Sequence, residues 1–325
     1  MTEDTRPATS VGTPPADPPG SRTTVLDVGG DVRLLAFPGP PGAPVLLCLH
    51  GLGGSALNFA AVGPLLAATH EVVAVDLPAH GRSRSPSGPD AVADALDVLD
   101  RVLGTLAGRP VTLVGASLGG VLAQRWLARG GAAVERLVLI DPPVPTGVDR
   151  ARDPRLTPRL AFLRAPGVGA LVQRQMARTD AEETVRRQLA QATPHVERVP
   201  AELRAAAVAE TRWRDARPDA GAARAAQWRM ILQTLQLLSR PRAWQAELER
   251  IAVPVLWLQG ADDLLAPVGH VRALAARLPS WSLRVREGVG HLPHLEDPDW
   301  TAAQLRDRLG GAQAAEKLRL DRPIA

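Results

Sequence analysis

The stretch VGASLGG (residues 114–120) places one serine among glycines, directly after the apolar run VTLV (111–114). The run favours a buried β-strand, and the residues that follow favour a helix. Gly115 and Gly119 stand two residues before and two residues after Ser117, where a sharp strand-to-helix turn leaves no room for side chains. Such a turn would expose the serine hydroxyl at a helix N-terminus, which favours developing negative charge. The stretch therefore fits a nucleophilic serine, but also a small residue in an ordinary connection, and the rest of the chain must decide.

Short apolar runs alternate with helical stretches on both sides of this serine. Their continuous hydrophobicity indicates strands that are buried on both faces, hence a mainly parallel sheet with helices on each side. Two earlier β-type runs flank Gly29-Gly30-Asp31 and predict a hairpin. The later runs are VLLCL (45–49), VVAV (72–75), VTLV (111–114), LVLI (137–140), VPVLWLQG (253–260) and SLRVREG (282–288).

The strand pattern stops near Pro142 and resumes near residue 251. The segment between is rich in Ala, Arg, Gln and Leu and has the apolar spacing of amphipathic helices. We therefore expect a helical insertion in an α/β core. The first residues are rich in proline and have no hydrophobic leader region, which predicts a disordered tail. The predicted parts are an N-terminal tail (1–22), the core (23–141 and 251–311), a helical cap (142–250) and a C-terminal tail (312–325).

Composition argues against several kinds of partner. The net charge is +4, but the arginines are interspersed with Asp and Glu along the chain, so we expect a solvated surface and no nucleic-acid binding. No apolar run approaches the roughly 18 residues of a membrane span, which predicts no membrane insertion. Cys48 is the only cysteine and lies in an apolar run, which predicts no disulfide and a cytoplasmic location. No His, Cys and carboxylate cluster has metal-ligand spacing, so we expect neither a metal nor another cofactor.

A nucleophilic serine needs a general base, and the base needs an orienting partner. Ligands of an open parallel sheet bind at the carboxyl ends of its strands, so both groups should follow strands. Asp263 follows VPVLWLQG, and His291 follows SLRVREG, each in the required position. Asp262 beside the first and Asp141 after LVLI compete for the role of the acid, although a loop or helix-cap position is expected for Asp141. His294 competes with His291 and could instead be a surface or helix-start residue.

The tetrahedral intermediate of acyl transfer needs two N–H donors for its oxyanion. Leu118 directly follows the serine and supplies one candidate. The segment HGLGG (50–54) follows the strand-like VLLCL, and its glycines would let the backbone approach a substrate, so the N–H of Leu52 is the other candidate. His50 in this segment is expected to pack and hydrogen-bond beneath the loop, and His80 is expected to support its own loop.

Five motifs, in order, make this chain resemble the α/β-hydrolase superfamily. The resemblance implies a mostly parallel eight-stranded sheet with helices on both faces, an inserted helical cap, and a Ser117, His291 and Asp263 triad. Ala79 is a departure, because a glycine is usual there. The motifs resemble the family's oxyanion loop, the loop after its fourth strand, its nucleophile elbow, acid loop and histidine loop: LHGLGG (49–54), DLPAHGRS (76–83), VGASLGG (114–120), GADDLLAP (260–267) and GVGHLPHLEDP (288–298).

The identity of the nucleophile narrows the classes of reaction that fit this chain. Epoxide hydrolases and haloalkane dehalogenases of this fold attack with aspartate, whereas this chain has serine at the elbow and no tyrosine to serve as an epoxide hydrolase's cap acid. Leu292 stands where carbon–carbon bond hydrolases typically have tryptophan. The leading interpretation is a carboxylic-ester hydrolase that acts on a small or medium ester, or a related acyl substrate, through an acyl-enzyme. The alternatives are a carbon–carbon bond hydrolase, a cofactor-free haloperoxidase or perhydrolase, and a receptor-like ligand-binding protein.

The insertion holds three tryptophans and many arginines. The tryptophans either pack its helices or line an acyl pocket, and the arginines either lie in solvent or turn inward to hold a substrate carboxylate. Helix packing and solvated faces are the simpler interpretations. The tryptophans are Trp213, Trp228 and Trp244.

Overall fold

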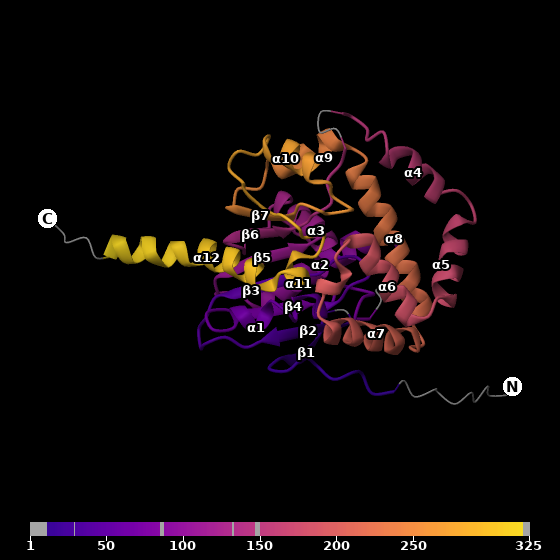
Figure 1. Ribbon diagram of the computed structural model, residues 1–325, viewed down its shortest axis with the longest axis horizontal. Helices are drawn as coiled ribbons and strands as arrows, with labels where there is room; N and C mark the ends of the chain where they lie inside the picture. The colour runs from indigo at the N-terminus through magenta and orange to yellow at the C-terminus, as the bar shows by residue number, and fades with distance from the viewer. Residues whose placement is uncertain (1–11, 29, 85–87, 132, 147–149, 321–325) are drawn as a thin grey trace.

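An eight-stranded sheet forms the centre of the protein (Figure 1). The structure, a computed structural model, describes residues 12–28, 30–84, 88–131, 133–146 and 150–320. The strand order is β1-β2-β4-β3-β5-β6-β7-β8; β2 pairs antiparallel with β1 and β4, and all other neighbours are parallel. The predicted hairpin and the mostly parallel sheet are both confirmed. The strands are β1 Arg22–Asp27, β2 Asp31–Phe37, β3 Val45–Leu49, β4 Glu71–Val75, β5 Val111–Ala116, β6 Arg136–Ile140, β7 Val255–Gly260 and β8 Ser282–Arg286.

Two hydrophobic clusters cover the two faces of the sheet, because successive side chains of a strand point in opposite directions. Leu47 and Leu113 belong to the cluster under α2, α3 and α10, whereas Leu46 and Val114 belong to the cluster under η1, α1 and α12. The central strands β3, β5 and β7 are buried along their whole length, as their continuous apolar runs predict. These helices are η1 Ala56–Phe59, α1 Gly63–Leu66, α2 Ala91–Thr105, α3 Leu118–Ala128, α10 Val268–Ala275 and α12 Pro298–Leu320.

The described residues between β6 and β7 form helices and no strand. The long helix α8 packs against α2, and α4 and α5 pack on α8, so that these two helices form the outer rim of the molecule (Figure 1). Within the described part of the chain, no helix is both long and apolar enough to cross a bilayer. The helices are α4 Leu156–Leu163, α5 Val168–Arg178, α6 Ala181–Ala192, α7 Ala201–Asp215, α8 Ala220–Leu238 and α9 Pro241–Leu248, with the short 3-10 helix η2 Val196–Arg198 between α6 and α7.

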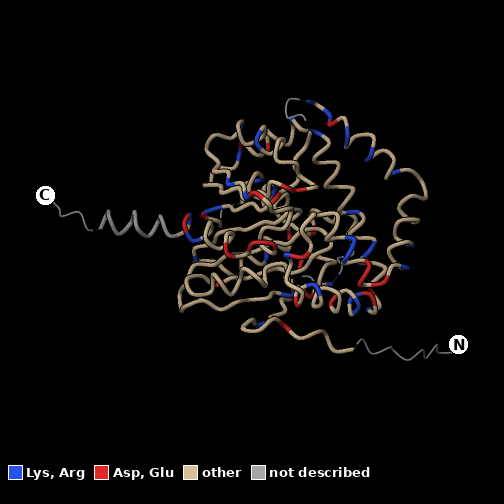
Figure 2. Tube along the Cα trace, in the orientation of Figure 1, with Lys and Arg blue, Asp and Glu red and all other residues tan. Residues whose placement is uncertain are grey.

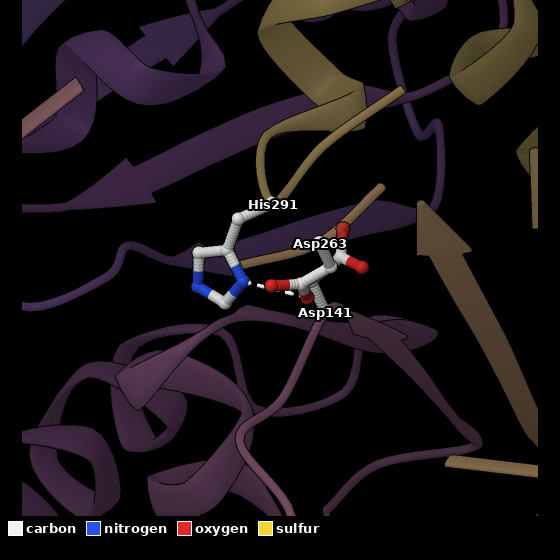
Figure 3. Close-up of side chains that lie close together, drawn as sticks. All are labelled: Asp141, Asp263 and His291. Atoms are coloured by element: carbon white, nitrogen blue, oxygen red, sulfur yellow. Dashed lines mark hydrogen bonds and ion pairs between the residues drawn. The ribbon is translucent and has the colours of Figure 1, made fainter. Parts of the chain in front are cut away.

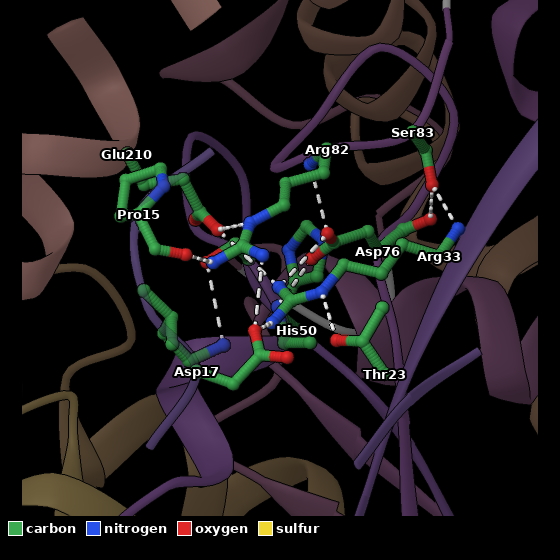
Figure 4. Close-up of polar contacts among 12 residues, drawn as sticks. Pro15, Asp17, Thr23, Arg33, His50, Asp76, Arg82, Ser83 and Glu210 are labelled. Carbon is green, nitrogen blue, oxygen red and sulfur yellow. Dashed lines mark hydrogen bonds and ion pairs between the residues drawn. The ribbon is translucent and has the colours of Figure 1, made fainter. Parts of the chain in front are cut away.

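A buried charge cluster joins the sheet to α7 and to the start of the chain (Figure 4). Arg33 on β2 is only 1% exposed and contacts Asp17, Asp76 and Glu210 at 2.8, 3.2 and 3.3 Å. Arg82 contacts Asp17 and Glu210 at 3.0 and 3.3 Å. Because three carboxylates share two guanidinium groups, the cluster has one negative charge in excess. Burial, and then the charge of Asp76, raise the pKa of Glu210 to about 7.

At both ends of the chain, the described structure extends into the predicted tails. Residues 12–21 fall in the predicted N-terminal tail, yet the Pro15 carbonyl accepts a hydrogen bond from Arg82 Nη2 at 2.7 Å, and Asp17 enters the charge cluster. The partners of this segment lie far away in the sequence, so its composition does not reveal them. Helix α12 runs to Leu320. Residues 1–11 and 321–325, the ends of the two predicted tails, lie outside the described residues.

Replacing Arg33 by leucine should lower the free energy of unfolding by about 3–5 kcal/mol, because buried carboxylates would lose their cation. Urea denaturation measures this loss. Arg84→Leu is the matched control, since its ion pair with Asp31 joins side chains that are 67% and 50% exposed and should contribute less than about 1 kcal/mol. Equal losses in the two variants would contradict this account of the cluster.

Candidate active site

Ser117 lies at the carboxyl end of β5, between this strand and α3. Its φ of 49° and ψ of −117° are rarely adopted by residues with a side chain. A Cβ at Gly119 would lie 2.1 Å from the Leu49 carbonyl oxygen, and one at Gly115 would lie 2.6 Å from the Gly119 carbonyl oxygen. Both glycines therefore have the structural task that the sequence predicts: without them the turn beneath Ser117 cannot close.

His291 and Asp263 meet at the carboxyl end of the sheet (Figure 3). His291 Nδ1 lies 2.8 Å from Asp263 Oδ2, and both side chains are buried. Burial alone would raise the pKa of Asp263, but the hydrogen bond and charge of His291 and the backbone N–H groups of Ala266 and Leu265 hold it below its usual value. Asp263 can therefore accept the Nδ1–H of His291, which leaves Nε2 as the ring nitrogen that can take a proton.

The structure does not join the serine to this pair by a hydrogen bond. Among the described residues, His291 Nε2 has no hydrogen-bond partner, Ser117 Oγ included. Such contacts are often long in the absence of substrate and tighten when it binds. Ser117 does lie against the predicted oxyanion loop, because a Cβ at Gly51 would be 3.1 Å from Ser117 Cβ and 3.6 Å from Ser117 Oγ.

The predicted oxyanion donors lie on either side of this contact. Within the described backbone, neither the N–H of Leu52 nor that of Leu118 donates to a carbonyl. His50 supports the loop from beneath: its Nε2 accepts the Leu77 N–H at 3.0 Å, and its Nδ1 lies 2.7 Å from the Gly51 carbonyl oxygen. Burial lowers the pKa of His50 to about 4, so the ring is neutral and can serve both contacts.

Glu296 holds the histidine loop in place, and the sequence analysis did not single it out. Its carboxylate accepts the N–H groups of Gly290 and Leu292, the two neighbours of His291, at 2.8 and 3.0 Å. Thr193, at the end of α6, donates its hydroxyl to the same carboxylate at 2.9 Å. The backbone on both sides of His291 is thus fixed by one buried side chain.

Helix α6 reaches both candidate loops. A Cβ at Gly53 would lie 2.7 Å from Gln188 Nε2, which places Gln188 against the oxyanion loop. The carbonyl of Ala192, the last residue of α6, accepts the N–H of His291 at 3.3 Å. The helical segment between β6 and β7 therefore borders the site through α6, a contact for which the amphipathic pattern offered no signal.

Two of the three competing residues, Asp262 and His294, have other partners. Asp262 contacts His195, with its Oδ2 2.8 Å from His195 Nε2. His294 is buried in the short helix α11, Pro293–Glu296, with its ring centroid 5.4 Å from that of Phe59. Burial, and then the charge of His291, lower the pKa of His294 to about 3. His294 is therefore a neutral core residue rather than a surface residue.

Two further expectations concern residues around the site. His80 Nδ1 lies 2.9 Å from the Pro78 carbonyl oxygen in its own loop, and Ala79 takes a φ of 66°, the backbone region that the usual glycine adopts easily. Trp228 and Trp244 are buried, and Trp213 Nε1 donates to the Gly12 carbonyl at 2.8 Å. The tryptophans therefore have packing and hydrogen-bonding partners away from Ser117.

Asp141 lies in the loop that follows β6, one of the two positions expected for it, and its side chain is next to Asp263 (Figure 3). It is fully buried, has a φ of 45°, and its Oδ1 accepts the Gly260 N–H at 2.8 Å. Burial, and then the negative charge of Asp263, raise the pKa of Asp141 well above its usual value. The pKa values of two neighbouring carboxyl groups are thus shifted in opposite directions, which favours the proton on Asp141 over Asp263.

Asp141, Asp263 and His291 also form a group whose possible ligand atoms lie within 4.8 Å of one another. Linear spacing did not reveal the group, because its members come from three different loops. Since Asp263 and His291 are already hydrogen-bonded to each other and burial raises the pKa of Asp141, the arrangement fits proton chemistry better than metal coordination.

Comparisons with known proteins agree with the fold. A family model described as the alpha/beta hydrolase fold matches residues 44–298. The magnesium-chelatase 30 kDa subunit of Rhodobacter capsulatus is 31% identical over 84% of this chain and 89% of its own. The pimeloyl-[acyl-carrier protein] methyl ester esterase of Xanthomonas oryzae pv. oryzae is 29% identical over 81% of this chain and 94% of its own. The structure of carboxylesterase CesB from Bacillus subtilis superposes with a TM-score of 0.64 at 22% identity, covering 90% of this chain and 92% of that one.

Replacing Gly119 by alanine should strongly destabilise the protein, because the new Cβ would overlap the Leu49 carbonyl oxygen. Thermal unfolding of the variant should show a large decrease in Tm or no cooperative transition. Gly104→Ala is the control, since a Cβ at this position in α2 meets nothing within 4 Å and should add up to about 1 kcal/mol of helix stability. An unchanged Tm for Gly119→Ala would refute the close approach.

Replacing Asp141 by asparagine should stabilise the protein more as the pH rises. Folding of the wild type must protonate Asp141, so its raised pKa contributes stability only at low pH, and this contribution is lost as the pH rises above about 4. Asparagine keeps an oxygen for the Gly260 N–H and needs no proton. Urea denaturation at about pH 5 and pH 8 should show a growing advantage of the variant, up to about 1.4 kcal/mol per pH unit. Asp307→Asn, on the exposed side of α12, is the control, and a pH-independent difference for Asp141→Asn would contradict the neutral carboxyl.

Proposed function

Because the chain belongs to the alpha/beta hydrolase fold family, we propose that it is a serine hydrolase that cleaves small or medium carboxylic esters through an acyl-enzyme. The observation that carries the proposal is the 2.8 Å contact between His291 Nδ1 and Asp263 Oδ2, at the same end of the sheet as the strained turn of Ser117. The esterase among its relatives supports the ester class of substrate.

In the proposed reaction, Ser117 Oγ attacks the acyl carbonyl while His291 Nε2 takes its proton. Asp263 holds the imidazole in the correct tautomer and stabilises its charged form. The N–H groups of Leu52 and Leu118 would receive the oxyanion of the tetrahedral intermediate. The alcohol then leaves with the proton of His291, and water repeats the sequence on the acyl-enzyme.

The residues around the proposed triad would hold its loops in position during this reaction. Glu296 fixes the backbone on both sides of His291, and His50 fixes the carbonyl that precedes Leu52. His50 and His294 are neutral, whereas His291 is the buried histidine of these loops that is paired with a carboxylate. We assign residues 142–250 as the cap, with Gln188 of α6 at the edge of the acyl site, since this side chain lies against the oxyanion loop.

A fluorophosphonate probe should label the wild type and not the Ser117→Ala variant, because the probe reacts with an activated serine hydroxyl. Ser280→Ala, on the exposed turn before β8, is the control and should be labelled like the wild type. Labelling of Ser117→Ala at the wild-type rate would refute the assignment of the nucleophile.

Asp263→Asn should lower kcat for p-nitrophenyl acyl esters by roughly 10³ to 10⁴-fold, since the imidazole would lose its orienting carboxylate. Asp262→Asn is the matched control, because this neighbouring carboxylate contacts His195 and should leave kcat nearly unchanged. Steady-state kinetics of the two variants test the proposal. Equal losses, or no hydrolysis of short and medium esters by the wild type, would contradict it.

A further inference from the structure

One stretch of the chain carries arginines with almost no acidic residues, although arginines and acidic residues are interspersed along most of the sequence. Residues 150–178 hold seven arginines and a single acidic residue, Asp153, an excess of six positive charges against a net charge of +4 for the whole chain. Figure 2 shows this basic stretch along the rim of the molecule that α4 and α5 form. The carboxylate of Asp153 accepts hydrogen bonds from the Thr146 hydroxyl and from the N–H groups of Arg155 and Leu156.

Each of these two helices turns one large apolar side chain and two arginines to solvent. Residues spaced by three, four and seven share a helix face, and the exposed residues follow this spacing. Phe162 is 66% exposed and Leu171 is 68% exposed, more than any other large hydrophobic side chain of the described residues. We call the six residues the α4–α5 face: Arg155, Arg159 and Phe162 on or next to α4, and Leu171, Arg174 and Arg178 on α5.

This face is distinct from the side by which the helices are packed. A Cβ at Gly169 would lie 2.7 Å from Trp228 Nε1, so this side of α5 is turned toward α8. Val172 and Met176, which share that side, are half-buried. The exposed apolar side chains are therefore not left over from the packing of α5 on α8.

The arginines of the face have no ion-pair partner in the part of the chain that the structure describes. Among the described residues, no carboxylate lies in salt-bridge contact with Arg155, Arg159, Arg174 or Arg178. Elsewhere exposed arginines do find partners, as Arg186 and Arg187 on α6 both contact Glu183. The face thus combines exposed arginines with exposed apolar groups, the two features that bind a helix to an anionic lipid surface.

We propose that the α4–α5 face docks this protein on an anionic lipid bilayer, with Phe162 and Leu171 entering the headgroup region. A bilayer with anionic lipids offers phosphates to the arginines and an apolar interior to the two side chains at once. A second copy would place like charges opposite each other across a two-fold contact. A nucleic acid would satisfy the arginines and leave Leu171 and Phe162 without an apolar environment. Docking of this kind needs no spanning helix and does not depend on the proposed ester hydrolysis.

Vesicle flotation tests the role of charge. At low ionic strength, the wild type should float with phosphatidylcholine vesicles that contain about 30% phosphatidylglycerol and not with pure phosphatidylcholine vesicles, and salt should weaken binding. Replacing the four arginines of the face by glutamine should lower the partition coefficient at least about tenfold. The matched control replaces four exposed arginines elsewhere by glutamine, with the same change in net charge: Arg101, Arg250, Arg284 and Arg308.

A labelled cysteine tests the insertion of the apolar side chains. Cys48 is buried and burial raises the pKa of its thiol, so an environment-sensitive dye will react at an introduced Phe162→Cys instead. Its emission should shift to the blue and become protected from a soluble quencher when anionic vesicles are added. Val25→Cys, at a position that is 57% exposed on β1, is the control and should show no shift.

Binding that the face variant loses and the control variant keeps, together with the shift at position 162, would support the proposal. Equal losses in the two quadruple variants would overturn it, since net charge alone would then explain binding. It would also be overturned if the label at position 162 showed no shift. A wild type that ignores anionic vesicles but binds an oligonucleotide or an acidic polypeptide through these arginines would overturn it as well. Circular dichroism of each variant shows whether its fold is retained.

Discussion

The close approach of α3 to the end of β3 is the constraint on which the site depends. Gly119 brings the first turn of α3 so near the Leu49 carbonyl oxygen that a Cβ would lie 2.1 Å from it. This contact accompanies the strained conformation of Ser117 and brings it beside Gly51 at the start of the predicted oxyanion loop. The proposed nucleophile and the proposed oxyanion donors are therefore positioned together by backbone packing, which costs no side-chain entropy when a substrate arrives.

Buried polar contacts between loops hold His291, Asp263 and Asp141 in position. Glu296 fixes His291 from both sides, Gln259 Nε2 donates to Asp263 at 2.8 Å, and Asp141 supports the end of β7 through Gly260. The pKa values of the two carboxyl groups are shifted in opposite directions, because Asp263 accepts hydrogen bonds from His291 and backbone donors, whereas Asp141 is buried next to the charge of Asp263. Environment alone thus separates the proton affinities of two neighbouring aspartates.

The sequence predicted the sheet and the proximity of Asp263 to His291, because these depend on apolar runs and on residues that directly follow strands. It did not reveal Glu296 or Gln188, since each acts through contacts between segments that are far apart in the chain, and it named Asp141 only as a competitor for the acid. The same limit applies to residues 12–21, which are held by distant arginines. Arginines interspersed with Asp and Glu predicted a solvated surface, yet helical spacing places four of them beside exposed apolar side chains on α4 and α5, a property that composition does not contain.

The helices α5 and α6, between β6 and β7, differ in how their charges are paired. In α6, Glu183 pairs with Arg186 and Arg187, and with Glu182 the charges of this helix, which borders the candidate site, balance. The arginines of α5 have no ion-pair partner among the described residues, although only Thr179 and Asp180 separate the two helices. A protein held at a lipid surface by the α4–α5 face would therefore keep α6 beside that surface without α6 itself being drawn into it. The helix pair α4 and α5 would then bind the lipid surface while α6 borders the candidate active site. Because only two residues connect α5 to α6, a displacement of α5 on binding would be transmitted to the helix that carries Gln188.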